Sequence, residues 1–145
     1  MTLLTTHFTL TELTRSSTAE RLGIDNTVPP IILPHLRVTA EGLEQIRALL
    51  GFPLHVGSGY RCAALNTAVG GARESAHMDG YAADFVCPAF DDPLSIVKAI
   101  EASDIQFDKC IQEGTWAHIS FAPTLRRELL TAHFGPAGTT YAQGV

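Results

Sequence analysis

The sequence predicts an α+β domain with a small, mainly antiparallel sheet and helices packed against it. Two observations indicate this class. The first third of the chain has helical periodicity, whereas strand-like and helical segments alternate after residue 53. The last ordered run, 107–121, divides around Glu113-Gly114-Thr115 into two strand-like pieces that can pair as a hairpin. Helices first, then strands mixed with helices, are typical of α+β proteins.

The N-terminal segment, residues 1–28, is expected to form a helical lid on the core. Thr9 and Glu12 have the three-residue spacing of a capping box. A second helical turn is expected at 18–22, and Gly23 follows it where helices often end in a left-handed residue. Together these short turns would cover one side of the core.

The longest helix is predicted between Ile32 and Leu50, after the pair Pro29-Pro30 and before Gly51. Its apolar residues recur every three or four positions, which is the pattern of one buried helix face. The charged residues of this segment are expected on the opposite, solvated face: Arg37, Glu41, Glu44 and Arg47.

Shorter elements are expected in the second half of the chain. Residues 54–56 and 82–86 are strand-like, and 63–69 has the pattern of a short helix closed by two glycines. Asp92 and Pro93 have the residue types that begin a helix, and an apolar face follows them. The small, polar tail, 137–145, is expected to be frayed.

Size and composition indicate a single domain, residues 1–145, that buries its own core. The formal net charge of −5 has the wrong sign for neutralising phosphates, so nucleic acid is not an expected partner. No apolar run approaches the roughly 18 residues of a membrane span, and the N-terminus lacks the pattern of a secretory signal. We therefore expect a monomer that is soluble and cytoplasmic when made.

The three cysteines, Cys62, Cys87 and Cys110, are an odd number and include no C-x-x-C pair. This pattern predicts neither a disulfide framework nor a thiolate metal site. We expect the thiols to be reduced and mostly buried.

A candidate metal site is carried by His77 and Asp84, seven positions apart, with Gly80 between them. Glycine permits turns forbidden to other residues, and the neighbouring alanines allow close approach, so both side chains can reach one ion. His118, on a predicted strand with Trp116 and Ser120 on the same side, supplies a third ligand. Two imidazoles and one carboxylate, with a fourth position open to water, form a catalytic zinc set. On spacing alone, Asp79 could replace Asp84.

These residues also carry a resemblance to a known family. The run S-x-H-x-x-G-x-A-x-D at 75–84 follows Ser58-Gly59-Tyr60-Arg61 and precedes Glu113 and the W-x-H ending at His118. This arrangement resembles the D-alanyl-D-alanine carboxypeptidase family of zinc peptidases, which includes the L-alanyl-D-glutamate endopeptidases of phage lysins. The resemblance spans about residues 6–120. The Hedgehog signalling domain shares this metal-site architecture.

The resemblance implies a Hedgehog-like or D-Ala-D-Ala-peptidase-like fold in which His77, Asp84 and His118 bind one Zn²⁺. It also implies that Arg61 anchors substrate or transition-state charge, a role that suits a planar guanidinium that never loses its charge. Glu113 is the expected general base for zinc-activated water.

The position of Glu113 departs from the family pattern. It lies five residues before the last histidine, whereas several members of the broader family place the acidic residue three before it, where this chain has Thr115. A turn at Gly114 could still direct Glu113 at the metal. Asp79 and Asp108 are the alternative bases.

Five further residues are expected around the site. Ser75 and Ser120 are candidates for hydrogen bonds that support the ligands. Ser58, Tyr60 and Trp116 are candidates for lining the cleft, with core packing as an equal alternative for Trp116.

The expected function is zinc-dependent hydrolysis of an amide bond in a peptidoglycan stem peptide, by a carboxypeptidase or an endopeptidase. If the cell wall is the substrate, a phage or prophage origin with release at lysis would explain how the protein reaches it. The alternative is a non-catalytic, zinc-stabilised domain that binds the wall or a partner, for example a phage structural component.

Overall fold

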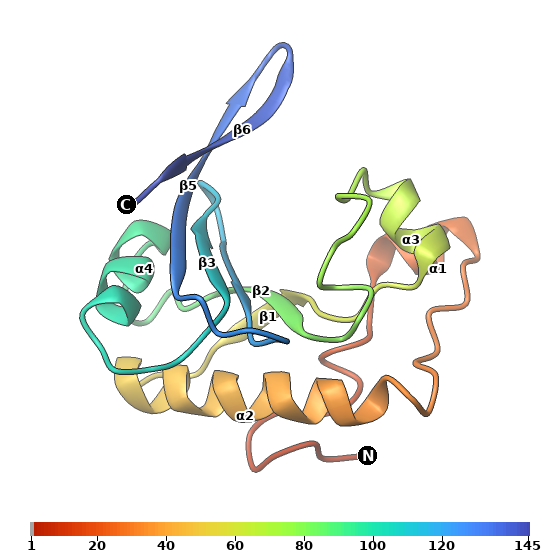
Figure 1. The fold of residues 1–145 in the computed structure, drawn as a ribbon. Coiled ribbons are helices and arrows are strands. Elements are labelled where there is room, and N and C mark those ends of the chain that lie inside the picture. The colour runs from red at the N-terminus through yellow and green to blue at the C-terminus, as the bar shows by residue number, and fades with distance from the viewer. Residues whose placement is uncertain (1) are drawn as a thin grey trace.

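The computed structural model describes residues 2–145. It contains a six-stranded sheet, and the long helix α2 lies along one side of this sheet (Figure 1). The helices are α1 (Ser17–Leu22), α2 (Leu33–Leu50), α3 (Ala63–Ala68) and α4 (Pro93–Glu101). The strands are β1 (His55–Ser58), β2 (Ala82–Val86), β3 (Lys109–Gln112), β4 (Ala117–Ser120), β5 (Glu128–Gly135) and β6 (Gly138–Gln143). Their order in the sheet is β1-β2-β4-β3-β5-β6, and only β3 and β5 are parallel neighbours. The predicted α+β class with a mainly antiparallel sheet is confirmed.

Helix α2 packs its apolar face against one face of this sheet. Its Leu36, Leu43 and Ile46 are completely buried and belong to the same core cluster as Phe85 of β2 and Ile119 of β4. Because successive strand residues point to opposite faces, the neighbours of Phe85 and Ile119 along each strand point away from α2. The core therefore fixes which side chains reach the open face of the sheet.

The N-terminal segment differs from the expected helical lid. The capping box is present, since Glu12 N–H donates to Thr9 Oγ1 at 3.1 Å and Thr9 N–H donates to Glu12 Oε1 at 3.2 Å, but it closes a turn rather than an α-helix. Phe8 and Leu13 are buried in the main core. The segment is thus part of the core, because its apolar side chains fill space that α2 and the sheet leave open, and only α1 is helical.

The expected frayed tail is wrong for residues 138–143, which form β6 and pair with β5 along its outer half. Neither strand of this hairpin was predicted. Backbone amides make the pairing, so the small and polar composition of the tail does not oppose it, and Thr and Tyr favour strands. Figure 1 shows the hairpin projecting beyond the rest of the sheet.

Two further expectations concern the cysteines and the membrane. All three cysteines are free, with Cys87 and Cys110 buried and Cys62 half-buried. Burial raises the pKa of the Cys110 thiol to about 12, so this thiol stays protonated. No helix among residues 2–145 has the length and apolar character needed to cross a bilayer.

Gly59 joins the N-terminal segment to the rest of the domain. A Cβ at this position would overlap the backbone of Leu13, whose carbonyl accepts a hydrogen bond of 2.7 Å from Tyr60 N–H. Gly57, two residues earlier, has no atom closer than 4.0 Å to such a Cβ. Substitution of Gly59 by alanine should therefore cause a steric clash, and the same substitution at Gly57 serves as its control.

We predict that Gly59→Ala destabilises the domain by about 1–3 kcal/mol, the usual cost of forcing an extra methyl group into a packed site. Gly57→Ala should leave stability unchanged or raise it slightly, because alanine loses less backbone entropy in a strand. Urea unfolding of both variants measures the difference. Equal stabilities would show that the backbone at Leu13 moves away from the added methyl group at little cost, and that its contact with Gly59 does not hold the N-terminal segment against the core.

Candidate metal centre

Three side chains converge on the open face of the sheet. Asp84 of β2 and His118 of β4 are register partners, and His77 comes from the loop that precedes β2. One potential ligand atom from each of the three lies within 4.8 Å of the other two. The loop returns through Gly80, whose φ of +78° favours glycine and whose Cβ position would lie 2.8 Å from Ile32 Cγ2. The structure thus brings together the three predicted ligands and leaves Asp79 out of this group.

His77 is oriented by a backbone carbonyl. Its side chain is buried, and Nδ1 lies 2.7 Å from the carbonyl oxygen of Gly59. A carbonyl can only accept, so Nδ1 carries the hydrogen and Nε2 presents a lone pair. That Nε2 lies 3.3 Å from Asp84 Oδ1. Burial also lowers the pKa of His77, which disfavours a second proton on the ring.

The lone pair of His77 Nε2 therefore faces a carboxylate oxygen of Asp84, Oδ1. Burial alone would raise the pKa of Asp84, but the two neighbouring imidazoles, His77 and His118, hold it well below its usual range. His118 Nδ1 lies 2.9 Å from the same Asp84 oxygen. An ionised carboxylate beside a bare imidazole nitrogen suits a cation, and two imidazoles with one carboxylate suit Zn²⁺. The donor set fits zinc, with His77, Asp84 and His118 as the residues that would hold it.

Arg61 lies next to this group, on the segment that leads into α3. Its Nη2 is 3.5 Å from Ser75 Oγ, and its Nε is buried without a hydrogen-bond partner among residues 2–145. Burial lowers the pKa of Arg61, whereas the charges of Asp84 and Glu113 raise it. Arginine stays protonated in proteins, so this guanidinium brings a positive charge close to two acidic groups.

Glu113 faces the same side of the sheet as His118. It directly follows β3, its N–H donates to the Trp116 carbonyl at 3.0 Å, and Gly114 turns the chain with a φ of +82°. Ile111 of β3 is the register partner of His118, so alternation turns Glu113 towards the same face. Burial raises the pKa of the half-buried Glu113, with smaller opposing effects from His118 and Arg61. Glu113 therefore lies on the ligand face despite its two-residue offset from the family pattern.

The alternative acids have other contacts. Arg126 binds both carboxylate oxygens of Asp108, at 2.6 and 3.2 Å. The Asp79 carbonyl lies 2.7 Å from His35 Nδ1, and its carboxylate is outside the three-residue ligand group. Glu113 is the acid that this geometry favours.

The supporting residues divide into two groups. Ser75 Oγ accepts from His77 N–H at 3.2 Å and contacts Arg61, so it links a ligand to the guanidinium. Ser120 Oγ instead accepts from Lys109 N–H at 3.2 Å, so this hydroxyl joins β4 to β3 and the expected bond to a ligand is not seen.

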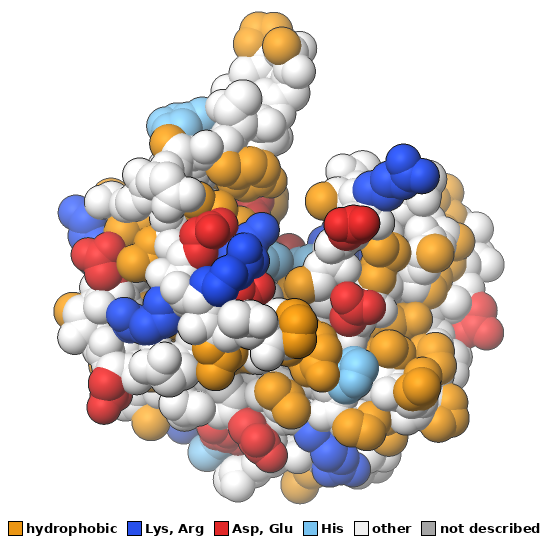
Figure 2. All heavy atoms as spheres, viewed as in Figure 1, with side chains coloured by type: hydrophobic (Ala, Val, Ile, Leu, Met, Phe, Trp, Pro, Cys, Tyr) orange, Lys and Arg blue, Asp and Glu red, His pale blue; other side chains and the backbone are white. Residues whose placement is uncertain are grey.

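The expected cleft residues also divide. Tyr60 is buried in the main core and does not line a cleft, because its N–H is held by the N-terminal segment and its ring packs beneath it. Ser58 and Trp116 line a cavity of about 290 Å³ that also contacts Asp84. Trp116 is partly exposed at this cavity, so it lines the cleft and is not packed in the core. The space-filling view shows a hollow with histidine side chains at its floor (Figure 2).

The family model for Peptidase M15 matches residues 6–120 of the chain. The chain belongs to the peptidase M15 family. A search of curated proteins finds no match. M15 peptidases are zinc enzymes that include D-Ala-D-Ala carboxypeptidases and lysins, so the resemblance seen in the sequence is confirmed, and family and ligand geometry together support a zinc peptidase.

One atom of this M15 chain that orients a ligand has no signal in the sequence. The Gly59 carbonyl that orients His77 is a backbone atom, so no side-chain pattern identifies it. In the sequence, the segment Ser58-Gly59-Tyr60-Arg61 draws attention through its arginine. Only the fold shows that the same segment also contacts a metal ligand.

We predict that His118→Ala abolishes zinc retention, because two ligands from one loop and one strand are too few for a stable tetrahedral site. His133→Ala is the matched control, since His133 is exposed on β5 outside the ligand group. Elemental analysis after dialysis should find about one zinc ion per chain in the control and almost none in His118→Ala. A zinc-loaded His118→Ala protein would disprove the site.

Proposed function

We propose that the protein hydrolyses an amide bond in peptidoglycan stem peptides as a zinc-dependent carboxypeptidase or endopeptidase. The observation that carries this proposal is the placement of Arg61, whose N–H donates to the His77 carbonyl, and of Glu113, on the ligand face of the sheet, near the three-ligand group. A domain that used its metal only for stability would need neither group. The positive charge of Arg61, close to Asp84 and Glu113, favours catalysis over a purely structural role.

Each residue has a distinct role in the proposed reaction. Zinc, when bound, supplies Lewis-acid chemistry towards the substrate carbonyl and makes water acidic enough to react near neutral pH. Glu113 accepts a proton from the attacking water and delivers it to the leaving amine. The raised pKa of Glu113 suits an acid that must both take and return a proton.

Arg61 binds negative charge in this proposal. Its guanidinium is close enough to Asp84 and Glu113 for their charges to raise its pKa, so a substrate carboxylate or the oxyanion that develops at the scissile carbonyl would find a charged partner there. Ser75 holds one end of the guanidinium and the backbone of His77, which keeps Arg61 in register with the ligands. Stem peptides carry carboxylates, which makes them suitable substrates for such a site.

The family to which the chain belongs includes lysins. We therefore infer that the protein is encoded by a phage or prophage and reaches the cell wall when the producing cell lyses. We also infer that it acts as a monomer. The cavity beside β1 and the hollow seen in Figure 2 leave room for peptide on the open sheet face.

Digestion of purified sacculi by the zinc-loaded protein tests the function. We expect new stem-peptide fragments whose masses identify the cleaved bond, and we expect no cleavage when a chelator removes the metal. A terminal D-alanine released alone would identify a carboxypeptidase, whereas internal cuts would identify an endopeptidase. Zinc-loaded protein that leaves sacculi and their soluble peptides intact would refute the proposal.

We predict that Glu113→Gln retains zinc but lowers kcat by about 10²-fold or more, which is the scale for losing a general base. Glu101→Gln is the control, because Glu101 is exposed at the end of α4. Zinc analysis and steady-state kinetics on the peptide found by digestion provide the two readouts. An unchanged kcat in zinc-loaded Glu113→Gln would assign the proton transfer to another residue.

A further inference from the structure

The β5–β6 hairpin lies outside the family match, yet it extends the open face that carries the ligands. The register connects the strands in an unbroken row. Asp84 pairs with His118, His118 with Ile111, and Ile111 with Leu130. Paired residues share a face, so Leu130 and its alternate neighbours on β5 lie on the same face as the metal ligands.

The next row of this face places Tyr141 two strands away from Glu113. Glu113 is two positions beyond Ile111, and Ala132 is two positions beyond Leu130, so both belong to this row. Tyr141 of β6 is the register partner of Ala132. Ala132 is the small residue between the acid and the phenol, so the Tyr141 ring is not screened from Glu113 by a bulky neighbour.

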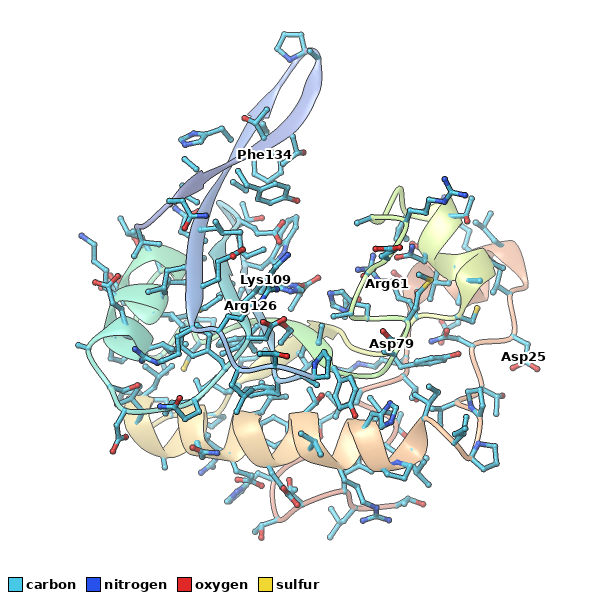
Figure 3. All side chains as sticks on the ribbon, viewed as in Figure 1. Asp25, Arg61, Asp79, Lys109, Arg126 and Phe134 are labelled. Atoms are coloured by element: carbon cyan, nitrogen blue, oxygen red, sulfur yellow. The ribbon has the colours of Figure 1, made fainter. Side chains whose placement is uncertain are left out.

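Two large aromatic side chains stand exposed on this hairpin. Tyr141 is 54% and Phe134 58% exposed, although the hairpin has apolar neighbours in Leu130 and Ala132 that are buried. Phe134 lies over the turn after Glu113, since its Cε2 is 3.6 Å from a Cβ position at Gly114. Figure 3 shows Phe134 on the hairpin and Arg61 on the opposite side of the opening.

The Tyr141 hydroxyl experiences the charges of the site. Burial raises its pKa, and the negative charges of Glu113 and Asp84 raise it further. The phenol therefore stays protonated and can donate a hydrogen bond. Tyrosine offers a rigid apolar ring together with this donor, a combination that binds peptides well.

We propose that the β5–β6 hairpin forms one wall of the substrate cleft and that Tyr141 binds the substrate peptide on the Glu113 side of the metal group. Its hydroxyl donates to a carbonyl or carboxylate of the peptide, and its ring, with Phe134 beyond it, packs against the side chains. This inference rests on the proposed peptidase function and assigns a binding surface to a segment beyond residues 6–120.

The sheet geometry defines which part of the substrate reaches the hairpin. β6 lies three strand positions from β4, and adjacent strands are about 4.8 Å apart, so about 14 Å separate the His118 and Tyr141 strands. An extended peptide covers about 3.4 Å per residue. The Tyr141 contact is therefore made by a residue about four positions from the scissile bond, which a stem peptide is long enough to supply.

The test uses Tyr141→Ala and Tyr141→Phe in the full, zinc-loaded chain. Thr140→Ala is the matched control, because Thr140 neighbours Tyr141 on β6 and alternation turns it to the other face. The substrates are the stem peptide found by sacculus digestion and two shorter peptides with the same scissile bond, each truncated at one end. Steady-state kinetics separate KM from kcat.

Tyr141→Ala should raise KM for the full peptide about tenfold, the scale for truncating an aromatic anchor, with kcat nearly unchanged. The effect should vanish for one truncated peptide, which no longer reaches the hairpin. Tyr141→Phe should show a smaller part of the effect, due to the hydroxyl alone. Thr140→Ala should behave like the wild type.

The outcomes separate the two proposals. If the wild type cleaves the peptide and Tyr141→Ala has an unchanged KM, the hairpin inference is overturned and the peptidase function stands. The inference also fails if KM rises equally for all three peptides, because a folding defect or a change at the metal explains that result. If the zinc-loaded wild type cleaves no stem peptide, both proposals fall.

Discussion

The contact between Asp84 and two histidines is the constraint on which the candidate site depends. Asp84 and His118 meet because β2 and β4 pair in one register, and a shift of either strand by one residue would turn the ligand on that strand into the core. His77 reaches them from a loop whose turn at Gly80 and bond to the Gly59 carbonyl leave little freedom. A cation between these groups would neutralise a carboxylate that burial alone would tend to protonate.

The same register extends the chemistry of the site across the sheet. Core packing against α2 assigns Phe85 and Ile119 to one face, and alternation then assigns the ligands to the other. Glu113 joins that face at the end of β3, and Tyr141 follows two strands further. Asp84, His118, the proposed base and the proposed substrate wall are therefore positioned by one hydrogen-bonded ladder, which is more rigid than a set of loops, and only His77 comes from a loop.

Prediction succeeded where the hydrophobic pattern had a strong period. The apolar repeat of α2 and the N-cap pair Asp92-Pro93 of α4 identified both helices, since a one-sided helix must repeat every three or four residues. It failed at 128–143, where an edge hairpin is held mainly by backbone pairing and most of its side chains are exposed. Such a hairpin requires no apolar alternation, so the sequence carries little signal for it.

The sequence by itself determined which residues can bind a metal, because ligand types and their spacing around Gly80 are local properties. It also determined the family, through the motif at 75–84 and the later W-x-H, which have the same order in this chain as in the family. The tertiary structure decided the direction of each side chain. Tyr60 turned into the core, Ser120 bonded β3, and Glu113 turned towards the ligands. These outcomes depend on strand register and on contacts between distant segments, which no local pattern encodes.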